Sequence, residues 1–154
     1  MPAIPAPVRD AVLLLARLIL GVVLFAHGWQ KFMMNGLDAT AAGFEQMGVP
    51  LPAVSAALAG TIELVTGVAI ILGALLPVAA VLVVFVMAGA AIFAHIGNGL
   101  FATDGGWELV AVIGAAAAIL GVVGGGRYSL DSGFLSGRKA QSESLRENAM
   151  SGHR

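Results

Sequence analysis

The sequence predicts an all-α integral membrane protein, folded as a four-helix antiparallel bundle with both termini in the cytoplasm. Composition is the first observation: 58% of the 154 residues are hydrophobic and only 11% are charged, whereas soluble domains carry about 25% charged residues. The second is the presence of four apolar stretches, of which the fourth is short for crossing about 30 Å of hydrocarbon. The third is the absence of Lys and Arg between Phe32 and Gly126.

The four apolar stretches define the organisation of the chain. They cover about residues 11–32, 53–76, 78–96 and 107–123, within a transmembrane domain of residues 11–132. Residues 1–10 form a short cytoplasmic amino terminus, and residues 133–154 form a polar tail, which we expect to be disordered because it contains few aromatic residues. None of the stretches alternates polar and apolar residues, as transmembrane strands do, so each is predicted to be a helix.

The sequence also predicts how the stretches are connected. Pro77 stands between the second and third stretches, where it can begin a helix in its first turn. So short a link forces the two helices into an antiparallel pair. Residues 33–52 are expected to form a long first loop, and residues 97–106 a last loop.

Charge placement predicts the orientation, because Lys and Arg are retained on the cytoplasmic side. The two long loops contain only acidic charges, whereas Arg9 precedes the first stretch and Arg127 follows the last. The tail adds four more basic residues, Arg138, Lys139, Arg146 and Arg154. The predicted location is therefore a bacterial-type plasma membrane, with the lipid bilayer as the principal partner.

Composition excludes several functions. The net charge of −1 provides no basic surface for nucleic acid. The absence of cysteine excludes disulfides, thiolate metal sites and thioether-attached haem, so no covalent cofactor is expected. Any redox role therefore requires a cofactor that is not covalently attached to the chain. The expected partners are membrane or peripheral redox proteins and further copies of this chain.

Ionisable residues within or beside the apolar stretches are the strongest functional signal, because each costs about 2.5–3.5 kcal/mol to insert at the centre of a membrane. There are six of them: Arg17, His27, Lys31, Glu63, His95 and Glu108. At 100° per residue, Arg17, His27 and Lys31 share one face of the first helix. Glu63 lies about 15 Å from the outer end of the second helix and shares its face with small residues. The pattern predicts a polar cavity in the outer half of the bundle.

Carboxyl and imidazole groups in such a cavity suit proton transfer to a quinone, whose reduction takes two protons and two electrons. His27 and Glu63 are the candidate catalytic residues. The candidate cofactor-binding residues are Arg17, His27, Lys31, Glu63, His95 and Glu108. Haem is disfavoured because His95 stands at a helix end, and no Glu-x-x-His pairs are present to hold a di-metal site.

Two other functions compete with a quinone site. A structural pair between Glu63 and either Arg17 or Lys31 would satisfy the buried carboxyl without chemistry, as expected of an accessory subunit. Intramembrane ionisable groups also occur in small proton or solute transporters, although the inner half of this chain offers only Arg17.

Several short motifs resemble the DoxX family. They are Arg17-x3-Gly21-x3-Phe25-x-His27-Gly28-x2-Lys31, Gly48-Val49-Pro50, Glu63-x3-Gly67, Leu72-Gly73 and the closing run from Gly126 to Asp131. The resemblance covers roughly residues 10 to 132. It implies a four-helix membrane protein associated with an oxidoreductase or respiratory system, in some relatives through thiosulfate oxidation with electron delivery to quinone. The residues of this chain that match functional positions of the family motifs are Arg17, His27, Lys31, Glu63 and Arg127. The lack of cysteine argues against direct sulfur chemistry.

Overall fold

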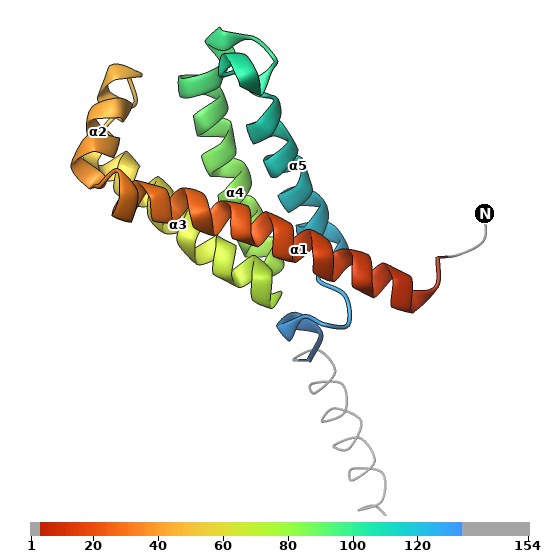
Figure 1. Ribbon diagram of the computed structural model, residues 1–154. Helices are drawn as coiled ribbons and strands as arrows, with labels where there is room; N and C mark the ends of the chain where they lie inside the picture. Colours follow the sequence, from red (N-terminus) through yellow and green to blue (C-terminus); the bar gives the residue numbers. More distant parts are fainter. Residues whose placement is uncertain (1–3, 134–154) are drawn as a thin grey trace, which may run out of the picture.

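A computed structural model describes residues 4–133 (Figure 1). All regular secondary structure in this range is helical, which confirms the predicted all-α class. The α-helices are α1 (Ala6–Trp29), α2 (Leu37–Gln46), α3 (Pro52–Leu72), α4 (Leu76–Ala90) and α5 (Glu108–Val123). The tail predicted from residue 133 onward lies outside the described residues, apart from Gly133 itself.

Three helical segments are long and apolar enough to cross a membrane. They are Ala6–Met34, Pro52–Leu72 and Leu76–Asn98, of 29, 21 and 23 residues. The fourth apolar helix, α5, has 16 residues and is shorter. Large apolar side chains such as Leu15, Val81 and Val122 are exposed on these helices, as expected where the surrounding medium is lipid. The protein is an integral membrane protein.

The first loop differs from its prediction, because it contains the ten-residue helix α2. Gly36 enters this helix at φ 79°, Asp38 lies in its first turn, and Gly48 leaves the following turn at φ 71°. An acidic residue in the first turn of a helix is favourable. Its buried Thr40 hydroxyl bonds the carbonyl oxygens of Gly36 and Lys31, at 2.9 and 3.2 Å, and so holds α2 against the end of the preceding helix.

Two spans continue past their α-helices as single π-helical turns, Gln30–Met34 after α1 and Ala91–His95 after α4. Short 3₁₀ turns at Ile96–Asn98 and Ala102–Asp104 then shape the last loop. Helix α3 also ends earlier than predicted, since Gly73 adopts φ 69° and ends the helix at Leu72.

The helices pack as two pairs, α1 with α3 and α4 with α5, and Figure 1 shows α1 crossing obliquely in front of the second pair. Glycines set the first contact. A Cβ atom on Gly21 would lie 2.7 Å from the Gly67 carbonyl oxygen, and one on Gly28 would lie 2.8 Å from that of Gly60. The matched order of these contacts makes α1 and α3 antiparallel. Small residues allow such close approach between membrane helices.

Arg17 connects three segments at the end of the molecule where α3 ends and α4 begins. Its guanidinium donates hydrogen bonds to the carbonyl oxygens of Gly125, Ile71 and Tyr128, at 2.8, 3.1 and 3.0 Å, and the residue is only 1% exposed. These oxygens belong to the end of α3 and to the segment after α5. Arg17 therefore joins α1 to both.

The segment after α5 also completes the turn between α3 and α4. The Asp131 carboxylate accepts hydrogen bonds from the backbone nitrogens of Leu75 and Leu76, at 2.8 and 3.1 Å. Helix α4 begins at Leu76 with Pro77 in its first turn, as the sequence predicts. A carboxylate at a helix amino terminus satisfies backbone donors that the helix leaves unpaired.

Candidate functional site

A buried ion pair joins the middle of α3 to the π-helical turn after α1. Lys31 Nζ is 2.6 Å from Glu63 Oε2, and the two side chains are 18% and 6% exposed. The sequence left open whether Arg17 or Lys31 would pair with Glu63, and the structure gives Lys31. Pairing offsets the cost of holding the carboxylate out of water.

The π-helical turns place two of the polar side chains. Lys31 belongs to the turn after α1, and His95 is the last residue of the turn after α4. Such turns insert one residue into a helix and are frequent at functional sites. Because Thr40 bonds the Lys31 carbonyl oxygen, α2 also restrains the backbone that carries the lysine.

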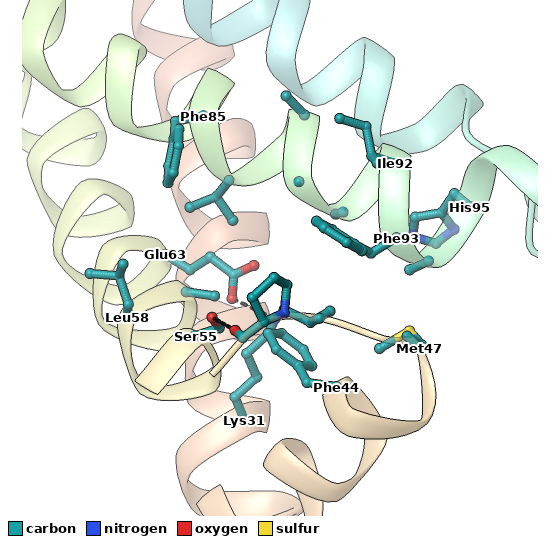
Figure 2. Close-up of a pocket in the computed structure, with 18 residues that line it drawn as sticks. Lys31, Phe44, Met47, Ser55, Leu58, Glu63, Phe85, Ile92, Phe93 and His95 are labelled. Carbon is teal, nitrogen blue, oxygen red and sulfur yellow. Dashed lines mark hydrogen bonds and ion pairs between the residues drawn. The ribbon is translucent and has the colours of Figure 1, made fainter. Parts of the chain in front are cut away.

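A cavity of about 570 Å³ opens between α3 and α4 beside the ion pair (Figure 2). Its walls are mainly apolar and come from α2, the segment after it, α3 and α4. The lining includes Phe44, Met47, Val49, Pro50, Leu58, Phe85, Ile92 and Phe93, with Lys31, Ser55, Glu63 and His95 as its polar side chains. Leu58 and Phe85 at its edge are 50% and 65% exposed, so the cavity opens sideways toward the lipid.

A smaller cavity of about 200 Å³ adjoins the first. It lies between α1, α3, α4, α5 and the last loop, and His27 is among its lining residues. Lys31, Glu63 and His95 line both cavities. These three side chains therefore form the boundary between the lipid-facing cavity and the one that contains His27.

The hydrogen bond of His95 indicates which ring nitrogen carries the proton when the ring is neutral. His95 Nδ1 is 2.7 Å from the Gly105 carbonyl oxygen. A carbonyl oxygen only accepts, so Nδ1 carries the proton, and the Nε2 of the neutral ring is an acceptor. This bond also holds the last loop against the end of the third span.

The structure brings together four of the six predicted residues, His27, Lys31, Glu63 and His95. Arg17 lines neither cavity, since it is enclosed near the middle of α1, against the end of α3 and the segment after α5. Glu108 also lines neither, and its Oε1 accepts a hydrogen bond of 2.6 Å from the Ala102 backbone nitrogen in the last loop. Both residues make structural contacts within the protein, and their expected contact with a cofactor stays a prediction.

Sequence reasoning missed the apolar wall supplied by α2 and the segment after it. Phe44, Met47, Val49 and Pro50 all lie in the stretch expected to be a plain loop. The sequence carries one usable signal there, because Phe44 and Met47 are three residues apart and so share a helix face.

Comparison of the sequence with known proteins identifies its family. The family model for DoxX matches residues 12–96, more than half of the chain. The chain belongs to the DoxX family. Its DoxX segment contains Arg17, His27, Lys31, Glu63 and His95, whereas Glu108 and the segment after α5 lie beyond it.

One curated relative extends the comparison. The chain is 35% identical over 98 residues to an uncharacterized membrane protein of Mycobacterium tuberculosis, an alignment that covers 60% of this chain and 59% of the relative. The chain thus matches less than two thirds of that protein's length. No solved structure matches the chain.

Proposed function

We propose that this DoxX-family protein binds a lipophilic ring compound of the quinone class in the larger cavity, as the membrane subunit of an oxidoreductase or respiratory system. The observation that carries the proposal is an apolar cavity, open toward lipid, that ends at a buried ion pair. Ligand sites combine mainly apolar walls with a few placed polar groups in just this way. The apolar walls suit the ring and its tail, and the ion pair suits the polar head.

Proton exchange is the chemistry that the boundary residues suit. Reduction of a quinone consumes two electrons, from a redox partner protein, and two protons. Glu63 and His95 border the ligand cavity, and His27 lies in the adjoining one. A carboxyl and imidazoles within reach of one another can pass protons toward a bound head group. Lys31 would orient that head and hold the Glu63 carboxylate in place.

We also propose that α5 is a fourth span and that both termini face the cytoplasm. The Asp10 carboxylate accepts a hydrogen bond of 3.2 Å from the Arg127 backbone nitrogen. The start of α1 and the segment after α5 therefore meet, and Arg9 and Arg127 lie at the same end. Two basic residues at one end, and acidic loops at the other, follow the distribution of charge across bacterial membranes.

The natural absence of cysteine allows a direct test of this orientation. Thr103→Cys places a thiol in the last loop, and Gly133→Cys places one beyond α5, both at exposed positions. In intact spheroplasts, a membrane-impermeant maleimide should label the first variant and spare the second. Lysed membranes should label both. Labelling of Gly133→Cys in intact cells would refute the cytoplasmic carboxyl terminus.

An accessory role without a ligand is the competing function, and one observation favours it. The Lys31–Glu63 pair already offsets the charge of the buried carboxylate, so the fold needs no ligand there. In that case the cavity would be filled by lipid chains, and changes in its shape would leave redox function intact.

A substitution that fills the cavity distinguishes ligand binding from the accessory role. A Cβ atom on Gly89 would meet nothing within 4 Å, and Gly89 lines the cavity, so Gly89→Phe adds a ring at the cavity wall from a position with room for the new Cβ atom. We expect at least a tenfold loss of affinity for a decyl-substituted quinone, measured by titration of the protein in nanodiscs. Val122→Phe is the matched control, because Val122 is 88% exposed and lines neither cavity. Equal affinities in the two variants would favour the accessory role.

A further inference from the structure

The polar groups of the larger cavity differ in what they offer a ligand. Glu63 Oε2 accepts from Lys31, and no described residue donates a hydrogen bond to Glu63 Oε1. In Figure 2 this second oxygen points away from the lysine. A carboxylate oxygen that faces a cavity and receives no hydrogen bond from the protein is a strong acceptor open to a ligand.

His95 and Ser55 add further hydrogen-bond acceptors to the cavity. His95 Nδ1 donates to Gly105, which leaves Nε2 as an acceptor. The Ser55 hydroxyl donates to the Pro50 carbonyl oxygen at 2.7 Å, which leaves lone pairs on its oxygen. Lys31 is the cavity's single side-chain donor with N–H groups to spare. Three side chains therefore accept where one donates.

We propose that the cavity selects ligands whose head group donates hydrogen bonds, so that it binds a hydroquinone or phenol in preference to the corresponding quinone. This inference rests on the proposed function and assigns the form of the ligand. A hydroxyl can donate to Glu63 Oε1 or to His95 Nε2 while its own oxygen accepts from Lys31. The two carbonyl oxygens of a quinone can only accept, so binding it would strip water from Glu63 and return no donor.

The preference has a consequence for the direction of the chemistry. A site that holds the hydroquinone more tightly lowers the free energy of the reduced form relative to the oxidised form. It therefore favours uptake of electrons by bound quinone, with the two added protons residing on the hydroxyls that donate to the cavity wall. The electrons come from the redox partner protein that the proposed function requires.

Three decyl-substituted compounds test the preference: the hydroquinone, the benzoquinone and the hydroquinone dimethyl ether. They differ at the head group and share the ring and tail. Titrated anaerobically into the full-length protein in nanodiscs, the hydroquinone should bind at least about tenfold more tightly than the other two. Equal affinities, or tighter binding of the benzoquinone, would overturn the preference and leave the proposed function standing. Failure of all three compounds to bind would overturn both.

A Glu63→Gln variant checks the residue assignment. The carboxamide oxygen can still accept from Lys31, and its amide nitrogen then faces the ligand as a donor. Affinity for the hydroquinone should fall about tenfold, whereas affinity for the benzoquinone should hold or rise. If the variant keeps the wild-type preference, Glu63 is not the selecting group and the proposal fails.

Discussion

Replacing Arg17 by Leu is expected to lower the free energy of unfolding by about 3–5 kcal/mol, because it removes a buried charge-assisted network and leaves its partners unpaired. Three carbonyl oxygens, from Ile71, Gly125 and Tyr128, accept from the guanidinium. No other donor takes the guanidinium's place once it is removed, and lipid supplies none. The change should be measured by reversible unfolding in mixed detergent micelles.

Arg9→Leu is the matched control for this variant. Arg9 lies on the same helix, its side chain is 62% exposed, and its contact with Asp10 is long at 3.6 Å. Exposed ion pairs contribute less than about 1 kcal/mol. Arg17→Lys should fall between the two variants, because a single ammonium cannot reproduce the fork that reaches three oxygens. Equal stability of Arg17→Leu and Arg9→Leu would show that the inner network contributes little.

Ligand binding should respond differently from stability. Arg17 lines neither cavity, so the folded fraction of Arg17→Lys should bind the decyl-substituted quinone with wild-type affinity. A loss of affinity in folded protein would restore the role in cofactor binding that the sequence suggested.

The predictions that held are those in which the signal is local. Hydropathy acts residue by residue, so composition predicts helices in lipid whatever their partners. The polar face of the first span follows from the 100° turn per residue, and it correctly brings His27 and Lys31 to the same side as Glu63. The pairing of Lys31 with Glu63 was one of two alternatives, which differ in whether the middle of α1 or the turn after it meets the carboxylate.

The predictions that failed, or that stayed open, depend on partners without a side-chain signature. Arg17 bonds backbone carbonyl oxygens, which every residue possesses, so no pattern in the sequence points to them. The apolar wall from Phe44 and Met47 requires α2 to fold back over α3, a tertiary contact that helix periodicity does not encode. The π-helical turns likewise have no known propensity signal, although they place Lys31 and His95.

Gly67→Ala is expected to destabilise the fold by about 3 kcal/mol, at the upper end of the range for overpacking. A Cβ atom on Gly67 would lie 2.7 Å from the Phe25 backbone nitrogen and 2.9 Å from the Gly21 carbonyl oxygen. Backbone atoms cannot rotate away as side chains can, so α1 and α3 must move apart. Gly43→Ala is the control, since nothing lies within 4 Å of its added methyl group. That variant should gain up to about 1 kcal/mol from helix propensity.

Gly28→Ala should displace the Lys31–Glu63 ion pair as well as destabilise the fold. Gly28 is three residues before Lys31, and its opposing Gly60 is three residues before Glu63, so this approach of the two backbones sets the separation of the charged groups. Its added methyl group would lie 2.7 Å from the Leu64 backbone nitrogen. Gly28→Ala should therefore lose ligand affinity in its folded fraction, whereas Gly67→Ala, farther toward the inner end, should retain more of it at a similar cost in stability. Parallel losses in the two variants would mean that the helix contact acts on the ligand cavity only through global unfolding.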